Sequence, residues 1–586
     1  MAFTVAQQDA IDHDGHCLIV AGPGSGKTTT FVAKAQRILS NPARRLLMVT
    51  FTREGADEMR RRLDEAQVKA GGRKLPEDRL LIGTFHSIAL RHLFRHRRKV
   101  PVLSPAQQNT FLQDAMGPLA MDPELGKEIR QEFEYFMYAI DRDKVEMSDN
   151  ASKVVHRYLE RLHASRSTDL YTIMRDCALF CDMEEIPPLP YTDMLVDEGQ
   201  DTDELQKVWI FAHARQGVNV SIVGDDDQSI YEWRHALGYS GMKSFMDSYN
   251  ARRIELGDNF RCKEEILNHA VVLVQHNKTR LSKRLVARRG NGGSIACYHT
   301  GSSEMQCKEL ARLIVETPDA HRETAILSRQ NFGLNDMEYA LTEAGVAYSR
   351  IGKSIWDNPD VSNYLSFLQS LLDGSPAGIF GVFGLIGIDD AVRMDMLHAM
   401  RGDSAAFLSG VLPDLPSATA TDVDHLKELG KSCNYWRKQL LAGSVTEVVL
   451  DVAEWVGSKH KRRRSKEIIE RCAAILGNLS GMLSKRLFFI NNSKKNAARS
   501  HVTLMTMHGS KGLEFETVHI IDANNPEDSS LLLHLEAERR LMYVAITRAK
   551  DRCIAWYNEA PHQTLVEAQL PVKHQYHDLV SMMGGG

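Results

Sequence analysis

The sequence predicts an α/β protein in which two parallel β-sheet domains are each interrupted by a mainly helical insertion. Strand–turn–helix units recur near the N-terminus, where the apolar runs Cys17–Ala21, Leu46–Phe51 and Leu80–Phe85 each lead into a helical pattern. Units of this kind specify a parallel sheet that helices cover on both faces. The same alternation returns in the second half of the chain, after long stretches without strand patterns.

The first predicted sheet is interrupted between about residues 91 and 190. This stretch is rich in Glu, Arg, Met, Leu and Gln and indicates successive helices. Strand patterns resume at Asp193–Glu198 and Asn219–Asp227, so the helical insertion lies inside the first sheet domain.

The second predicted sheet has the same organisation. Its strands are Ile295–Thr300, Glu323–Ser328, Ala347–Gly352, Val502–Met507, Val518–Asp522 and Cys553–Tyr557, with a helical region between about residues 356 and 500. The predicted division is therefore 1–90 plus 190–256 for the first sheet domain, 91–189 for its insertion, 257–355 plus 500–560 for the second sheet domain, 356–499 for its insertion and 561–586 for a short tail.

The composition is that of a folded protein with several domains. The 586 residues are too many for one core, and 43% hydrophobic with 25% charged residues argues against disorder. A net charge of -4 excludes a global basic excess, so any nucleic-acid binding must depend on local patches. Nine scattered cysteines favour a reducing, intracellular setting and disfavour a metal–cysteine site.

We expect a cytoplasmic protein that does not cross a membrane. The N-terminal residues are polar and acidic, unlike those of a signal peptide. The most apolar stretch, Ala377–Ile388, is too short to span a bilayer and predicts a buried helix or tight turn.

A phosphate-binding loop is predicted where the first strand meets its helix. The segment comprises Ala21, Gly22, Pro23, Gly24, Ser25, Gly26, Lys27, Thr28 and Thr29. Small residues let backbone N–H groups surround phosphates, Lys27 neutralises β/γ oxygens, and the Thr28 hydroxyl can ligate Mg²⁺. A Gly-rich turn without function is the alternative, which the strand–loop–helix context disfavours.

Two adjacent carboxylates follow a hydrophobic strand in LVDEGQD. We expect Asp197 to hold the Mg²⁺ shell and Glu198 to polarise the attacking water, two tasks that nucleotide hydrolysis requires. Alone, such a pair is weak evidence for nucleotide hydrolysis, because acidic residues often begin loops. Together with a phosphate loop it is strong evidence.

Five motifs occur in order along the chain: LVDEGQD, VGDDDQSIYEWRHA, LGDNFRC, TLMTMHGSKGLEFE and ERRLMYVAITRAK. Together with the phosphate loop they resemble the motif series of the UvrD/Rep/PcrA group of superfamily-one helicases. The resemblance covers nearly the whole chain apart from the two insertions. It implies two RecA-like domains of the P-loop NTPase class that use ATP and Mg²⁺.

The resemblance also implies roles for residues around the nucleotide. Gln7 matches the glutamine that reads the adenine edge, Phe260 the aromatic that stacks on adenine, and Glu514 the acid that contacts the ribose. Arg261 and Arg548 match two arginines that reach the γ-phosphate from the second sheet domain. Arginines in that position stabilise the charge that builds up during phosphoryl transfer.

For single-stranded DNA the resemblance points to aromatic, polar and basic positions at the strand-facing motifs. The set consists of Phe51, Thr52, Thr84, Phe85, His86, Tyr231, Trp233, Arg234 and His508. Gln228 matches the glutamine that links the γ-phosphate to this face. Aromatic side chains can stack on unpaired bases without sequence preference, and packing in a core is the alternative.

Three of the motifs depart from the family pattern. Thr29 stands where many relatives carry an arginine, so the side chain that would cover the other face of the adenine differs. Arg53 and Glu54 replace the common Asn and Lys, and Gly509–Ser510 replaces the frequent Ser–Ala.

Two basic runs lie in the predicted insertions, Arg91–Lys99 and Lys459–Lys466. A solvated helix face is the ordinary reason for such a run. The resemblance implies instead that insertions contact the duplex ahead of the fork, where these runs would supply salt-sensitive phosphate binding.

The predicted function is that of an ATP-dependent DNA helicase or translocase in repair, replication or recombination. The resemblance implies 3′-to-5′ movement on single-stranded DNA and a forked or 3′-tailed duplex as substrate. The alternative is a DNA-stimulated ATPase motor subunit that acts with a partner nuclease or repair protein, for example in phage defence. A non-enzymatic scaffold is disfavoured because the motif residues are present, and a small-molecule kinase because it would need no second sheet domain.

Overall fold

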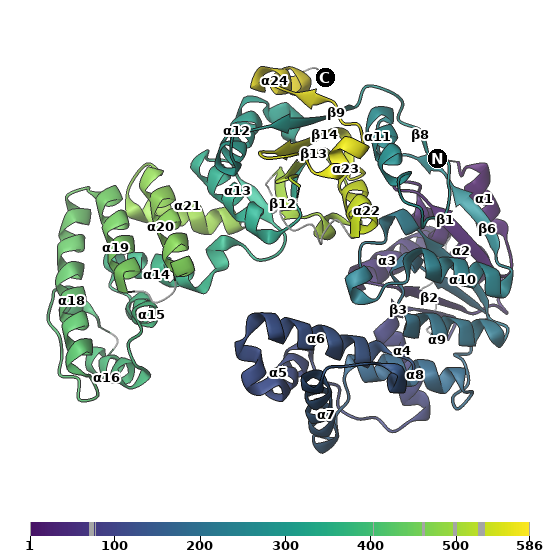
Figure 1. Ribbon diagram of the computed structural model, residues 1–586, viewed down its shortest axis with the longest axis horizontal. Coiled ribbons are helices and arrows are strands. Elements are labelled where there is room, and N and C mark those ends of the chain that lie inside the picture. Colours follow the sequence, from purple (N-terminus) through teal and green to yellow (C-terminus); the bar gives the residue numbers. More distant parts are fainter. Residues whose placement is uncertain are drawn as a thin grey trace. The chain divides into compact units, whose positions relative to one another are not determined.

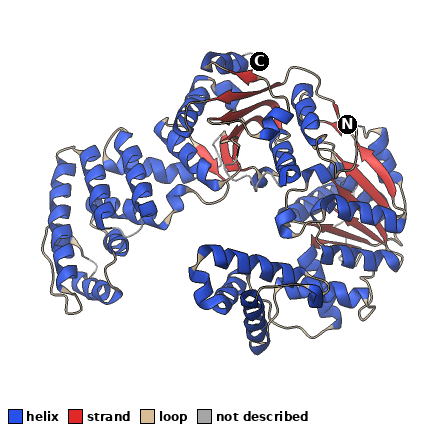
Figure 2. Ribbon diagram, in the orientation of Figure 1, coloured by secondary structure: helices blue, strands red, loops and turns tan. Residues whose placement is uncertain are grey.

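A computed structural model describes residues 2–69, 76, 78–401, 403–459, 463–495, 501–525 and 534–584 (Figure 1). The chain divides into two compact units, here called unit 1 (Met1–Gly292 and Ser530–Tyr543) and unit 2 (Gly293–Ser529 and Val544–Gly586). Each unit contains one large parallel sheet and a group of helices (Figure 2). The predicted α/β class is therefore confirmed.

The unit 1 sheet has six parallel strands in the order β3-β2-β4-β5-β1-β6. They are β1 (Cys17–Ala21), β2 (Leu46–Thr50), β3 (Leu80–Thr84), β4 (Asp193–Val196), β5 (Asn219–Gly224) and β6 (Arg252–Leu256). Alternate residues of β1 enter two different cores: Leu18 and Val20 pack on one face, and Cys17, Ile19 and Ala21 on the other. Since strand side chains alternate between faces, a strand that is apolar throughout must be covered on both sides.

Helices on both faces of this sheet complete the layers. They are α1 (Val5–Asp12), α2 (Lys27–Ser40), α3 (Arg53–Lys69), α9 (Glu204–Arg215) and α10 (Gly238–Tyr249). Helix α11 (Glu264–Val274) follows them in the chain and contacts the short strand after it.

Five helices occupy the stretch between β3 and β4, where the described residues form no strand. They are α4 (Phe85–His96), α5 (Pro105–Met116), α6 (Pro123–Tyr138), α7 (Asp149–Ala164) and α8 (Leu170–Asp182). Helices α5 to α7 have a small core of their own that includes Leu112, Phe133 and Tyr158. Helices α4 and α8 instead pack in the sheet core through residues such as Ile88 and Cys177.

Residues 257–292 lie in unit 1, whereas we predicted that the second sheet domain begins at residue 257. This segment carries α11 and a two-stranded pair, β7 (Asp258–Asn259) with β8 (Val286–Ala287). Contacts with the phosphate loop hold it there: Asn259 Nδ2 donates to Pro23 O at 2.7 Å, and Phe260 N donates to Gly24 O at 2.9 Å. The five-part division made from the sequence is finer than these two units and stays a prediction.

The unit 2 sheet has seven parallel strands in the order β11-β12-β10-β13-β14-β9-β15. They are β9 (Ser294–His299), β10 (Thr324–Ser328), β11 (Tyr348–Arg350), β12 (Val502–Thr506), β13 (Phe515–Ile521), β14 (Ala549–Tyr557) and β15 (Val572–Lys573). The accompanying helices are α12 (Ser303–Glu316), α13 (Asn331–Glu343), α22 (Leu535–Ile546), α23 (Gln563–Glu567) and α24 (Tyr576–Gly584), of which α22 runs across the division at Tyr543.

The C-terminal segment is part of this sheet rather than a separate tail. Strand β15 pairs with β9 through Val572 and Cys297, and α24 buries Leu579 and Met583 against the core. We had predicted residues 561–586 as a short tail, of which Gly585 and Gly586 lie outside the described residues.

A helical subdomain interrupts unit 2 between β11 and β12. Its helices are α14 (Pro359–Asp373), α15 (Pro376–Ile386), α16 (Asp390–Met400), α17 (Ala405–Leu408), α18 (Ala420–Leu441), α19 (Val445–Lys459), α20 (Arg463–Asn478) and α21 (Leu483–Lys495). The apolar stretch from residue 377 to 388 forms α15 and its C-terminal turn, which pack in one large core, so the predicted buried helix is confirmed. No helix in the described part of the chain is long and apolar enough to cross a bilayer.

The nine cysteines are buried and outside any disulfide. Cys181 lies near His92 and His213, but both imidazoles are already bonded as neutral core side chains. Trp209 Nε1 donates to His92 Nδ1 at 3.1 Å, and Leu189 N donates to His213 Nε2 at 3.1 Å. Burial lowers the pKa of His92 to about 4 and that of His213 to about 3. The cluster is therefore part of the core and not a metal site.

Unit 2 contains a second buried histidine pair. Trp556 Nε1 donates to His519 Nδ1 at 3.2 Å, so His519 carries its proton on Nε2 and donates it to His321 Nε2 at 3.0 Å. His321 Nδ1 then donates to Thr317 O at 2.8 Å. Burial lowers the pKa of His321 from 6.5 to about 4. The neutral form that burial favours is also the form that these hydrogen bonds need.

Replacing His321 should make stability less dependent on pH. The unfolded chain binds the histidine proton below about pH 6.5 and the folded chain only near pH 4, so stability is lost as pH falls through this window. One such histidine accounts for about 2 kcal/mol between pH 7 and pH 5. Scanning calorimetry of H321Q at both pH values should show a smaller decrease in Tm than wild type. The exposed His299 offers the control H299Q, and equal decreases in wild type and H321Q would contradict the assignment.

Candidate nucleotide and nucleic-acid site

The phosphate loop lies between β1 and α2, as predicted. Gly24 and Gly26 have φ values of 61° and 77°, in the left-handed region that glycine adopts without strain. Gly26 is the N-cap of α2 and offers no side chain to cap the helix, so the N–H groups of the first turn remain available to an anion. Lys27 and Thr28, which begin α2, are half-buried, and Thr29 is exposed.

Contacts on several sides fix the conformation of this loop. Ser25 Oγ donates to Gly22 O at 2.8 Å, and Gln7 Nε2 donates to Ser25 O at 3.1 Å. A Cβ at Gly22 would lie 2.4 Å from the Leu285 side chain, and one at Gly24 would lie 2.6 Å from Arg261 Cβ. The loop is therefore held in place before any phosphate binds.

Unit 1 brings together most residues predicted around the nucleotide. Gln7 Oε1 accepts from Thr4 N at 3.0 Å, so its amide joins the start of α1 to the phosphate loop. Phe260 is 41% exposed and is held to Gly24 by its backbone N–H. Arg261 stands beside Gly24 in the same unit, whereas we expected it to approach from the second sheet domain. The reason is that the whole segment up to Gly292 packs with unit 1.

Asp197 follows β4 and is nearly buried. Its backbone N–H donates to Val49 O at 2.9 Å, and its side chain is 8% exposed. Burial, reinforced by the charge of Glu198 and opposed by Lys27, raises the pKa of Asp197 to about 7. A divalent cation would supply the counter-charge that this carboxylate needs. The oxygen donors of Thr28 and Asp197 suit the hard ion Mg²⁺.

Glu198 adopts an uncommon backbone conformation. Its φ and ψ are 51° and 45°, which cost a non-glycine residue about 1–3 kcal/mol. Gln200 Nε2 donates to Glu198 Oε2 at 2.5 Å and so orients the carboxylate. Strain of this kind persists where the surrounding contacts determine the position of the residue.

A buried ion cluster follows β5. Lys283 Nζ lies 2.6 Å from Asp225 Oδ1, 3.0 Å from Asp226 Oδ1 and 2.6 Å from Asp227 Oδ2, and Arg280 forms a two-point pair with Asp227. Burial alone would lower the pKa of Lys283, but the three aspartates outweigh it and raise that pKa. Neither Lys283 nor Arg280 was predicted from the sequence. The three consecutive aspartates could have indicated them, because buried carboxylates need cationic partners.

Three residues predicted to bind DNA form one surface cluster. The rings of Phe51 and Tyr231 are stacked, with centroids 5.7 Å apart and planes 15° from parallel. The Arg234 guanidinium lies 5.8 Å from the Tyr231 centroid. Both rings are half-exposed, which leaves them accessible to a base. The side chain of Trp233 lies outside the described residues.

The other predicted DNA positions in unit 1 have structural partners. Thr52 Oγ1 accepts from Gly55 N at 3.0 Å, and Thr84 Oγ1 accepts from Ser87 N at 3.4 Å at the start of α4. Phe85 is 3% exposed and packs edge-on against Trp209, in the core position that was the alternative for such aromatics. His86 is half-buried, and burial lowers its pKa.

Three predicted site residues belong to unit 2. Arg548 is 1% exposed; its Nε donates to Val544 O at 2.9 Å and its Nη1 to Leu513 O at 3.2 Å. Glu514 is exposed and pairs with Lys550 at 3.2 Å. His508 is half-buried in the 3-10 turn His508–Ser510.

Where they are described, the two basic runs include ion pairs at the protein surface. In the first, Arg97 pairs with Glu185 at 2.6 Å and covers the Phe180 ring at 4.5 Å. In the second, Arg463 pairs with Glu467 at 2.9 Å, while residues 460–462 and the Arg464 side chain lie outside the described part. The described members therefore favour the solvated-face alternative.

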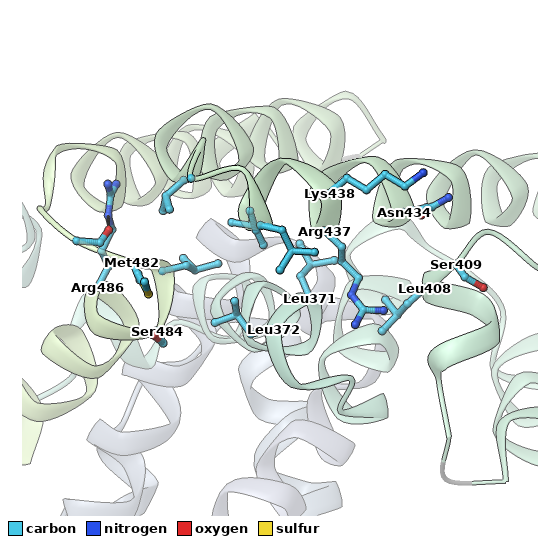
Figure 3. Close-up of a pocket in the computed structure, with 16 residues that line it drawn as sticks. Leu371, Leu372, Leu408, Ser409, Asn434, Arg437, Lys438, Met482, Ser484 and Arg486 are labelled. Carbon is cyan, nitrogen blue, oxygen red and sulfur yellow. Dashed lines mark hydrogen bonds between the residues drawn. The ribbon is translucent and has the colours of Figure 1, made fainter.

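A separate cavity of about 890 Å³ lies in the helical subdomain of unit 2 (Figure 3). Leucines such as Leu371, Leu408 and Leu440 line it, and Arg437 extends into it from α18 (Figure 3). None of the predicted site residues lines this cavity, so it is distinct from the nucleotide site.

Comparison with known proteins gives matches over both units. The family described as the UvrD/REP helicase N-terminal domain matches residues 3–249, and the UvrD-like helicase C-terminal domain matches residues 463–560. The ATP-dependent DNA helicase PcrA of Bacillus subtilis (strain 168) is 26% identical over 619 residues, which cover 93% of this chain and 81% of that protein. DNA helicase II of Escherichia coli (strain K12) is 26% identical over 612 residues, covering 92% of this chain and 82% of that protein.

Removal of Lys283 should strongly destabilise unit 1. K283M leaves three buried carboxylates without their shared cation, and breaking a buried ion pair from one side costs about 3–5 kcal/mol. Urea denaturation should therefore show a lower midpoint than wild type. The exposed Lys278 gives the matched variant K278M, expected within about 0.5 kcal/mol of wild type. Equal stability of the two variants would show that the cluster contributes little.

Proposed function

Because this chain belongs to the UvrD/Rep family of ATP-dependent DNA helicases, we propose that it hydrolyses ATP in unit 1 and uses the cycle to move 3′ to 5′ along single-stranded DNA. On this proposal it unwinds forked or 3′-tailed duplexes or removes proteins bound to DNA. The observation that carries the proposal is the combination, in one unit, of a pre-shaped phosphate loop, the Asp197–Glu198 pair and the exposed Phe51–Tyr231 stack.

In the proposed site, the chain's own residues divide the work of hydrolysis. Lys27 and the N–H groups at the start of α2 bind the phosphates, and Glu198 takes the proton of the attacking water. Thr28 and Asp197 would hold Mg²⁺, which neutralises phosphate charge when bound. Arg261 stands beside the phosphate loop, where its charge stabilises the transferred group.

The nucleoside end of the site is proposed to involve three residues. The exposed Phe260 offers its ring face to adenine, and Gln7 presents its amide next to Ser25. Glu514 of unit 2 is proposed to contact the ribose. Arg548 of unit 2 would have to exchange its bonds to Val544 and Leu513 for a phosphate before it could act as a second arginine.

Steady-state ATP hydrolysis with and without oligodeoxythymidylate tests the proposal. Wild type should hydrolyse ATP faster with the oligonucleotide. The DNA-stimulated rate of E198Q should be at least about a hundredfold lower than that of wild type, because no base remains to take the proton of the water. E204Q, a change at an exposed glutamate of α9, should behave as wild type. Absence of DNA-stimulated hydrolysis in wild type would contradict the proposal.

Truncation of Tyr231 should weaken binding of single-stranded DNA. Stacking on an aromatic side chain is worth about 1–3 kcal/mol per base, so Y231A should raise the Kd for oligodeoxythymidylate by about 5- to 150-fold. Fluorescence anisotropy measures this directly. Y435A removes an exposed tyrosine from the helical subdomain and is the matched control. An unchanged Kd for Y231A would show that the Phe51–Tyr231 stack does not bind DNA.

The direction of movement is tested with two duplexes that differ only in the end that carries the single-stranded tail. Strand displacement from the 3′-tailed duplex alone is expected. Displacement from the 5′-tailed duplex alone would contradict the proposed polarity and indicate movement from 5′ to 3′.

A further inference from the structure

Gln200 is a buried glutamine whose side-chain amide and backbone carbonyl contact Glu198 on one side and Asp225 and Ser229 on the other. Its Nε2 donates to Glu198 Oε2 at 2.5 Å, and its Oε1 accepts from Asp225 N at 2.9 Å. Its backbone O accepts from Ser229 Oγ at 3.3 Å. The residue is 0% exposed. It therefore joins the segment that carries the catalytic carboxylate to the segment that leads into the DNA-facing motif.

The Asp225 side of this junction is rigid. One oxygen of the Asp225 carboxylate pairs with Lys283, and the other accepts from Gln228 Nε2. A Cβ at Gly224 would lie 2.6 Å from Gln200 Oε1, so the backbone at the end of β5 approaches the amide as closely as a glycine allows. A displacement of the segment after β5 must therefore move the Gln200 amide.

On the other side of the junction, Glu198 is less enclosed than Gln200. Glu198 is half-buried and its left-handed backbone stores strain, whereas Gln200 is fully enclosed. The hydrogen bond from Gln200 Nε2 helps to orient the Glu198 carboxylate, so a small shift of the amide changes where the carboxylate points.

The segment after Gln228 continues to the DNA-facing ring stack. Ser229 is two residues before Tyr231, and its backbone O accepts from Arg540 Nε at 3.1 Å. Arg540 also pairs with Glu232, so the segment from Ser229 to Glu232 is held as one piece. A base that displaces Tyr231 would act on Ser229 and, through it, on Gln200.

We propose that Gln200 is the positioning residue through which DNA bound at the Phe51–Tyr231 stack orients Glu198 and raises the rate of ATP hydrolysis. This inference rests on the proposed function, because it needs both hydrolysis at Glu198 and DNA at Tyr231. The coupling follows the chain from Tyr231 back to Ser229 and Asp225 and then their hydrogen bonds to Gln200. Removal of the Gln200 amide breaks its contacts with Asp225 and Glu198 while each site keeps its own residues.

The test compares ATP hydrolysis by wild type, Q200M and Q200E, with and without saturating oligodeoxythymidylate. Methionine keeps the length of the side chain and lacks both amide groups. Glutamate keeps an acceptor for Asp225 N and lacks the donor to Glu198, so it serves if Q200M fails to fold. The expected result is at least a tenfold smaller ratio of DNA-stimulated to basal kcat, with the KM for ATP and the Kd for the oligonucleotide both within about twofold of wild type.

A merely structural role for Gln200 would change KM, Kd and stability together and would leave the stimulation ratio of the folded variant as in wild type. That result would overturn the inference. Q216M changes an exposed glutamine at the end of α9 and should match wild type in every measurement. A wild-type protein without DNA-stimulated hydrolysis would instead overturn the proposed function, and this inference with it.

Discussion

The burial of Lys283 among three aspartates determines how the nucleotide site of unit 1 is assembled. Desolvation of four charges is unfavourable, and only the close pairing of Lys283 with Asp225, Asp226 and Asp227, together with Arg280, offsets it. The cluster fastens the segment around residue 283 to the end of β5. The same segment carries Phe260 and Arg261, so the ion cluster also keeps these two residues beside the phosphate loop.

Local signals in the sequence predicted the parts of the site that are formed by neighbouring residues. The strand Cys17–Ala21, the glycines after it and Lys27 at the start of α2 specify their own conformation, because turn geometry and helix start are short-range properties. Asp197 and Glu198 were equally predictable, since their positions follow from the end of a buried strand. The helical insertions followed from the absence of strand patterns.

Long-range contacts determine what the sequence did not predict. The segment 257–292 joins unit 1 through hydrogen bonds to Pro23 and Gly24 and through Lys283, partners that no local pattern identifies. The C-terminal segment became part of a sheet because β15 pairs with β9, a contact between distant residues. Phe85 looks like a surface aromatic in its motif, yet its position at the start of α4 directs the ring into the core beside Trp209.

Mechanical continuity from Tyr231 to Glu198 is what couples DNA binding to hydrolysis in the proposed mechanism, and amide hydrogen exchange of the full-length protein measures it most directly. The peptides that cover residues 198–201 and 225–231 are compared with and without oligodeoxythymidylate, in the absence of nucleotide. We expect both peptides to change protection together on DNA binding, and we expect Q200M to abolish the change in residues 198–201 alone. A change confined to residues 225–231 in wild type would contradict the continuity, because the DNA signal would then end before it reaches the carboxylate.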